Sequence, residues 1–99
     1  MAESLGNARL FYSTEGRGGN VRYQSDVAKF EMWWEFGGGK AVAVIDVPSE
    51  KYWESQTGLP LDQRDKVLDF IGQRVAKDQV SSGKGRYELG GGFLTIYGG

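Results

Sequence analysis

The chain has 99 residues, of which 39% are hydrophobic and 13% aromatic, and its formal net charge is −1. This length and composition predict one folded domain over residues 1–99 rather than a disordered segment. The sequence contains neither cysteine nor histidine. That composition excludes a disulfide framework, zinc sites built from those residues, and catalysis by a thiolate or an imidazole. We therefore expect neither a metal nor a cofactor.

Charge and hydropathy along the chain bear on its partners and its location. Residues 26–69 carry five basic and nine acidic side chains, so the centre of the chain is acidic. No apolar run reaches the ~18–20 residues that a membrane-spanning helix needs. The beginning of the chain, MAESLGNARL, lacks the charged and apolar regions of a secretion signal. The sequence predicts a cytoplasmic protein that does not bind membranes, with a frayed start over residues 1–8.

The first part of the chain predicts two strands, over 9–14 and 21–24, separated by a glycine-rich turn over 15–20. Val21 and Tyr23 alternate onto one face of the second strand. A two-residue turn at Ser25-Asp26 would place Val21 beside Phe30 and Tyr23 beside Ala28. All four side chains then share the apolar face of the next strand, which favours a meander of antiparallel strands.

Residues 29–47, KFEMWWEFGGGKAVAVIDV, predict a β-hairpin with Gly37-Gly38-Gly39 as its loop. In that register Trp34 lies opposite Val42, and Met32 lies opposite Val44. The inner, apolar face of the hairpin then holds Phe30, Met32, Trp34, Phe36, Val42 and Val44. The outer face holds Lys29, Glu31, Trp33 and Glu35, opposed by Val47, Ile45, Ala43 and Ala41. Asp46 falls on the inner face near Phe30 in this interpretation.

Two helices follow Pro48. Ser49 is a suitable N-cap for a short helix over 50–57, which Gly58 ends. Asp62 is a candidate N-cap for a long helix that continues to Val80. Its apolar stripe comprises Val67, Leu68, Ile71 and Val75, at helical spacing. Gly72, inside this helix, costs about 1 kcal/mol relative to alanine unless close packing requires it.

The C-terminal part predicts a last hairpin, with strands over 86–89 and 93–97 around Gly90-Gly91-Gly92. Its predicted faces are Tyr87, Leu89, Phe93, Thr95 and Tyr97 on one side and Arg86, Glu88, Leu94 and Ile96 on the other. Strands that are segregated from helices indicate the α+β class. We expect an antiparallel meander of about four strands, one main helix packed on it, and this C-terminal hairpin.

The first candidate binding surface comprises Glu31, Trp33 and Glu35, extended by Tyr52 and Trp53. An exposed tryptophan between carboxylates suits a cation, a basic segment of a partner protein, or the face of a sugar ring. The same side chains would instead be packing residues if the outer face of the sheet were covered, and Tyr52 and Trp53 could simply pack under a loop. Because Glu31 and Glu35 repel phosphate, this surface disfavours nucleic acid.

The same carboxylates support an alternative from another class, a hydrolase or carbohydrate-binding domain using Glu31, Trp33 and Glu35 with Asp46. Glu31 and Glu35 are four strand residues apart, so their Cα atoms are separated by ~13 Å at about 3.3 Å per residue. Paired glycosidase carboxyl groups lie about 5–9.5 Å apart. This spacing weakens the catalytic interpretation, and we name no catalytic residue.

Two glycine loops, EGRGGN (15–20) and SGKGR (82–86), could form a third kind of site. Glycine loops with a cation can bind anions through their backbone N–H groups. If the loops were adjacent, the site would comprise Arg17, Gly18, Gly19, Lys84 and Arg86. Neither loop has the sequence of a P-loop or of a dinucleotide-binding turn, and glycine is equally explained by the need to reverse the chain.

In their order and spacing, the segments GGNVRY (18–23), KYW (51–53) and LPLDQRDKVLDFI (59–71) resemble those of small bacterial immunity proteins that neutralise polymorphic toxins. The C-terminal hairpin departs from that pattern, and no functional residue is carried over. The resemblance implies a non-enzymatic protein that occupies a toxin domain through a charged surface. We thus expect a small protein-interaction module whose partner is another protein. A homodimer through the sheet face or an edge strand stays open.

Overall fold

The computed structural model describes residues 8–80 and 83–98. Its elements, in chain order, are β1 (Arg9–Glu15), β2 (Gly18–Gln24), β3 (Lys29–Phe36), β4 (Ala41–Asp46), α1 (Glu50–Thr57), the 3₁₀ turn η2 (Leu61–Gln63), α2 (Arg64–Gln79), β5 (Arg86–Gly90) and β6 (Phe93–Tyr97). The predicted frayed start over residues 1–8 lies outside the described residues, except for Ala8, which packs against the core.

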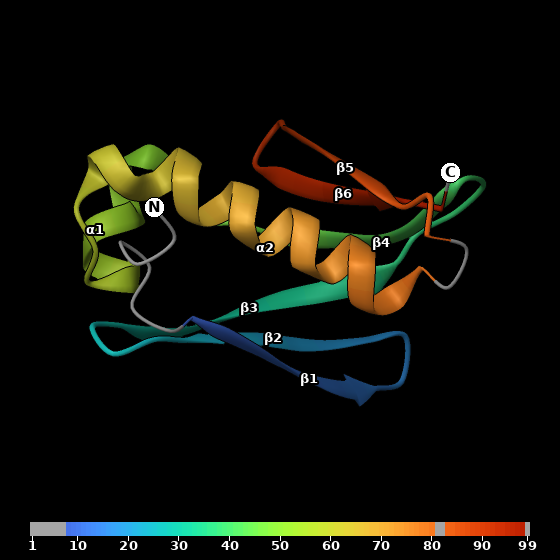
Figure 1. The fold of residues 1–99 in the computed structure, drawn as a ribbon, viewed down its shortest axis with the longest axis horizontal. Coiled ribbons are helices and arrows are strands. Elements are labelled where there is room, and N and C mark those ends of the chain that lie inside the picture. The colour runs from blue at the N-terminus through green and yellow to red at the C-terminus, as the bar shows by residue number, and fades with distance from the viewer. Residues whose placement is uncertain (1–7, 81–82, 99) are drawn as a thin grey trace.

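All described strands form one six-stranded antiparallel sheet in the order β1-β2-β3-β4-β6-β5. The first four strands form the predicted meander, and β6 pairs with β4, so that β5 lies at the edge. The main helix α2 crosses one face of the sheet, and α1 lies at the end of the sheet where α2 begins (Figure 1). The predicted α+β class is confirmed. The sheet is larger than the predicted four strands because the C-terminal hairpin extends it.

The turn between β3 and β4 corrects the predicted register. Ala41 N–H donates to Gly38 O at 3.1 Å, so the turn has Gly39 and Lys40 at its centre rather than the glycine triplet. Trp34 then pairs with Ile45 and Phe36 with Ala43. A two-residue turn in place of a three-residue loop shifts the pairing by an odd number of residues, which exchanges the two faces of β4. Ala43 and Ile45 are therefore in the core, and Val44 is on the outer face.

The predicted register of the C-terminal hairpin is also wrong, again because the turn has two residues rather than three. Gly90 pairs with Phe93, so the turn contains only Gly91 and Gly92, which have φ of +63° and +83°. Positive φ at both central residues is the geometry of the two-residue turn that matches strand twist, and glycine adopts it without strain. The inner face of this hairpin consists of Tyr87, Leu89, Leu94 and Ile96.

The side chains of β2 and β3 lie on the predicted faces, but the residues that pair across the two strands differ from the prediction. Ser25 N–H donates to Ala28 O at 2.8 Å, and the Ser25 hydroxyl accepts from the N–H groups of Val27 and Ala28. The loop between β2 and β3 is two residues longer than the predicted turn, so Tyr23 pairs with Phe30 and Val21 with Met32. A shift of two residues leaves every side chain on its original face.

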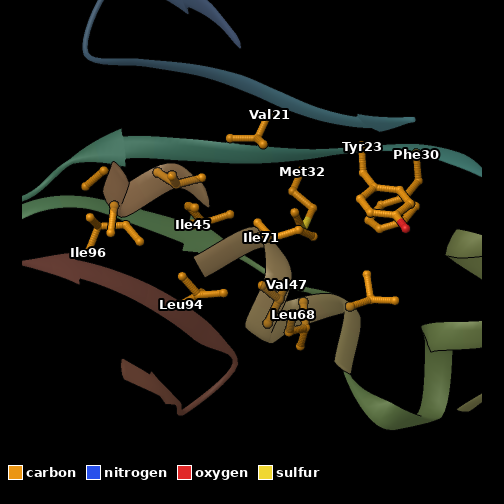
Figure 2. Packing of buried hydrophobic residues seen from close by; sticks show 14 of the residues in the cluster. Val21, Tyr23, Phe30, Met32, Ile45, Val47, Leu68, Ile71, Leu94 and Ile96 are labelled. Carbon is orange, nitrogen blue, oxygen red and sulfur yellow. The ribbon is translucent and has the colours of Figure 1, made fainter. Parts of the chain in front are cut away.

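The core lies between α2 and the sheet, and the predicted stripe of α2 is confirmed. Val67, Leu68, Ile71 and Val75 are all buried, and they share one cluster with the inner face of the sheet (Figure 2). Gly72 is also buried, and a Cβ atom placed there would lie 2.5 Å from the Tyr87 ring. Close packing between α2 and β5 therefore requires glycine at this position.

Both predicted ends of α1 are confirmed, whereas α2 begins later and ends one residue earlier than predicted. Ser49 is the N-cap of α1, without a side-chain capping bond, and Gly58 ends that helix with φ of +75°. Asp62 is not the N-cap of α2, because Gln63 N–H donates to Pro60 O and makes a 3₁₀ turn first. The N-cap of α2 is Gln63, and α2 ends at Gln79 before Val80.

Candidate functional site

The outer face of the sheet, opposite α2, carries a group of exposed aromatic and acidic side chains. Alternation along β3 places Glu31, Trp33 and Glu35 on this face, because Phe30 and Met32 point into the core. Trp33 is 37% exposed and Phe93, from β6, is 44% exposed. The structure therefore leaves open to solvent the three residues that the sequence singled out.

Trp33 is held in place by its neighbours. Its indole Nε1 donates to Glu35 Oε2 at 3.1 Å. Its ring lies over Gly18, where a Cβ atom would meet Trp33 Cζ2 at 2.8 Å. Because Gly18 supplies no side chain, the ring packs against the backbone of β2. These contacts hold the tryptophan ring in one orientation, and a side chain that is already ordered loses less entropy when it binds another molecule.

Asp46 also lies on this outer face, whereas the sequence predicted it on the inner face near Phe30. It follows Ile45 on β4, and the exchanged faces of that strand turn its exposed carboxylate outward. Asp46 and Trp33 together line two shallow hollows. Glu31, Pro48 and Gln56 border the first, and Glu35, Val44 and Phe93 border the second. We call Glu31, Trp33, Glu35, Asp46 and Phe93 the Trp33 surface.

The chemistry of the Trp33 surface follows from an aromatic ring with carboxylates beside it, one of which, Glu31, lies opposite Arg22 of β2. The ring face attracts a cation through its quadrupole, and carboxylates accept hydrogen bonds from guanidinium or ammonium groups. Within residues 8–80 and 83–98, no three acidic side chains come close enough together to hold a metal ion. The carboxylates are thus spread around Trp33 rather than gathered at one point.

Tyr52 and Trp53, the predicted extension of the surface, have different environments. Trp53 is fully buried, its Nε1 donates to Pro60 O at 3.0 Å, and its ring packs edge-on against Phe30. It belongs to the core and cannot contribute to an exposed surface. Tyr52 is 50% exposed and lies one helical turn before Gln56, on the same face of α1. Gln56 lines the first hollow, whereas Tyr52 lines neither hollow.

The residues of the predicted anion site are not brought together. Arg17 lies in the turn between β1 and β2, whereas Lys84 and Arg86 lie at β5, and the sheet order places β3, β4 and β6 between them. Arg86 pairs with Glu88 at 2.8 Å and lies over the Tyr97 ring. The two glycine loops therefore do not form one phosphate site.

Gly18 and Gly19 are strand residues rather than loop residues. Both are buried in β2, paired with Glu35 and Trp34 of β3. A Cβ atom at Gly19 would meet Ser13 O at 1.8 Å, and one at Gly18 would meet Trp34 O at 2.2 Å. These contacts join separate strands, so no local pattern in the sequence signals them.

Comparisons with known proteins give no likeness to draw on. The chain matches no protein-family model, and no curated protein or solved structure is significantly similar to it. In the part of the chain that the structure describes, no helix has both the length and the apolar character to cross a membrane. The geometry of the site is therefore the main evidence that bears on function.

Proposed function

We propose that this chain is a small, non-enzymatic interaction protein that binds a basic region of another protein through the Trp33 surface. The observation that carries the proposal is the position of Asp46, which brings a third carboxylate beside Trp33 and lines both hollows with it. An exposed tryptophan is the side chain most often found to dominate binding energy at protein interfaces.

The charge around Trp33 determines the kind of partner. Glu31, Glu35 and Asp46 are all exposed on one face, and the surrounding segment 26–69 is acidic overall. A partner lysine or arginine would stack on the Trp33 ring and pair with these carboxylates. Such pairing supports fast association with a basic surface and rejects an acidic one.

A finer form of the proposal follows from the resemblance to small bacterial immunity proteins. Neutralisation of a toxin needs only that an inhibitor occupy a functional surface of the toxin, without chemistry of its own. An exposed acidic and aromatic sheet face would suit a toxin domain whose own surface is basic. We propose that the partner is a toxin domain of this kind.

The test is affinity capture with the full chain at moderate salt, read by mass spectrometry, with three variants in parallel. We expect the wild type to retain one stoichiometric protein. Trp33→Ala and Asp46→Lys should lose it, because they remove the aromatic contact and reverse one charge. Val27→Ala, which shortens an exposed side chain in the β2–β3 loop, should retain it as the control.

Each outcome of this capture has a definite meaning. A secreted toxin domain would support the finer proposal, and another basic protein would support only the interaction. A partner that Trp33→Ala and Asp46→Lys both retain would show that the Trp33 surface is not the contact. Capture of a second copy of the chain would indicate a homodimer through the sheet face or an edge strand. No captured protein at all would contradict the interaction proposal.

A second candidate function is carbohydrate binding on the same face, and the position of Asp46 also favours it. A sugar ring stacked on Trp33 would find carboxylate acceptors on either side, in Glu35 and Asp46. Titration of the chain with a panel of neutral oligosaccharides, followed by its tryptophan fluorescence, distinguishes this candidate. A saturable change that Trp33→Phe abolishes, in a chain that captures no protein, would favour the sugar.

A further inference from the structure

A cavity of about 170 Å³ lies on the inner face of the sheet, away from the Trp33 surface. It lies beside the last turns of α2, over the strands β1 to β4, and its walls include Tyr12, Val21, Trp34, Phe36, Ala43 and Val75. Figure 1 shows α2 crossing the sheet, with β1 and β2 lying to one side of it. The helix therefore leaves part of this face uncovered.

The aromatic wall of the cavity is fixed in position. Trp34 Nε1 donates to Ser13 O at 3.2 Å, which sets the plane of the indole. Trp34 and Phe36 pack edge to face, with ring centroids 4.9 Å apart and planes at 89°. Phe36 is 59% exposed and stands at the edge of the cavity. These contacts hold the wall open without help from a ligand.

The opposite side of the cavity is held by a bond between β1 and α2. The Tyr12 hydroxyl donates to Asp78 Oδ2 at 2.7 Å, joining residues that are 66 positions apart in the chain. This bond sets the distance between the edge of the sheet and the end of the helix. Tyr12 has thereby used its proton, but its hydroxyl oxygen can still accept a hydrogen bond.

The size and polarity of the cavity determine which molecules can bind in it. An engineered apolar cavity of about 150 Å³ in another protein binds benzene, so this volume admits one aromatic ring. The lining contains no charged side chain, and burial of an unpaired charge would be costly. Thr14, Gln79 and the Tyr12 hydroxyl provide the polar groups of the lining.

We infer that this cavity is a binding site for a small, uncharged, single-ring aromatic molecule that carries a hydroxyl or amine donor. Its ring packs against Trp34 and Phe36, and its donor bonds the hydroxyl oxygen of Tyr12. The site is independent of the proposed partner interaction, because it lies on the other face of the sheet. Failure of either proposal leaves the other in place.

The test uses phenol and benzene as probes, with methyl shifts followed by NMR. We expect phenol to shift the methyl groups of Val21, Ala43 and Val75 in a saturable way, while Val44 on the outer face stays unchanged. Phenol should bind about three- to tenfold more tightly than benzene, the value of one hydrogen bond. Absence of a saturable shift in the wild type would overturn the inference.

Two variants and a matched control make the test specific. Ala43→Leu extends a side chain into the cavity, so phenol binding should fall at least tenfold while the helical signal persists. Val44→Leu places the same side chain on the other face of β4 and should leave binding unchanged. Equal binding by Ala43→Leu and the wild type would place the ligand elsewhere and overturn the site.

If Ala43→Leu does not fold, Tyr12→Phe tests the proposed site instead. It keeps the ring of Tyr12 but removes the oxygen that accepts the bond from the ligand. Because the variant also loses the bond to Asp78, the readout is the ratio of the two affinities: we expect the preference for phenol over benzene to disappear. An unchanged preference for phenol would contradict the proposed orientation of the ligand.

Discussion

The two faces of the sheet both carry tryptophan, yet adjacent residues of one strand have opposite surroundings. Trp34 points inward, where it packs against the core and bonds Ser13 O, whereas Trp33 points outward and bonds the carboxylate of Glu35. The inner face is shared with α2. The outer face combines aromatic rings with Glu31, Glu35 and Asp46.

The two tryptophans differ in the side chains that surround them: apolar side chains around Trp34, and carboxylates beside Trp33. Apolar side chains stabilise the inner face because α2 removes them from water. Trp33 is 37% exposed and its ring lies over Gly18, so it gains less from burial than the side chains beneath α2. Charge beside the ring therefore distinguishes the outer face from the core.

The largest effect that would test this comparison is expected from two neighbouring residues of β4. Ile45 is fully buried on the inner face, and Val44 lies on the outer face. Ile45→Ala should lower the free energy of unfolding by about 2–5 kcal/mol, since it leaves a cavity. Val44→Ala should cost less than about 1 kcal/mol.

Urea denaturation of both β4 variants measures these two costs. The reverse order, with Val44→Ala the more damaging, would mean that Gly37-Gly38-Gly39 forms a three-residue loop and that the faces of β4 are exchanged. This pair thus tests the turn between β3 and β4 as well as the contrast between faces.

A smaller loss of stability is expected from Gly72→Ala, where α2 approaches β5. Alanine normally favours a helix over glycine by about 1 kcal/mol. At Gly72 the sign should reverse, because the new methyl group would meet the Tyr87 ring at 2.5 Å. We expect Gly72→Ala to destabilise the protein by about 1–3 kcal/mol, the usual cost of overpacking.

Thermal and urea unfolding of Gly72→Ala, with a control and a double variant, checks this sign. Gly38→Ala should be neutral, because no atom lies within 4 Å of the added Cβ and Gly38 has no positive φ. In a Tyr87→Ala background, Gly72→Ala should lose most of its cost. A stabilising Gly72→Ala in the wild type would show that α2 and β5 are less closely packed.

The smallest effect concerns alkaline pH. Burial, together with the hydrogen bond that its hydroxyl donates to Asp69, raises the pKa of Tyr87 to about 12 from an ordinary value of 10.0. The folded state therefore disfavours the tyrosinate relative to the unfolded chain. The resulting stability is present below pH 10 and is lost as the pH rises from 10 to about 12.

Unfolding curves between neutral pH and pH 12 follow this loss. Tyr87→Phe should flatten part of the decline, while burial also raises the pKa of Tyr12 and of Tyr23, so a decline remains. Tyr52→Phe, at an exposed position, is the control and should leave the curve unchanged. An identical decline in Tyr87→Phe would indicate that the bond to Asp69 is absent in solution.

The sequence alone determined the order of the elements, the α+β class, the inward and outward faces of β2 and β3, and the buried stripe of α2. These follow from alternation and helical spacing within one segment, which need no knowledge of the rest of the chain. For the same reason Glu31, Trp33 and Glu35 were recognisable as one outward-facing group.

Only the tertiary structure decided the faces of β4, β5 and β6, and with them the position of Asp46. Each glycine triplet permits turns of different length, and one residue more or less exchanges the faces of the following strand. Ile45, Leu94 and Ile96 are the side chains buried beneath α2, and the two-residue turns place them there. Likewise Gly18 and Gly19 lie within β2, where an added Cβ atom would meet the Trp33 ring at Gly18 and the backbone of β1 at Gly19, contacts between separate strands that no local pattern expresses.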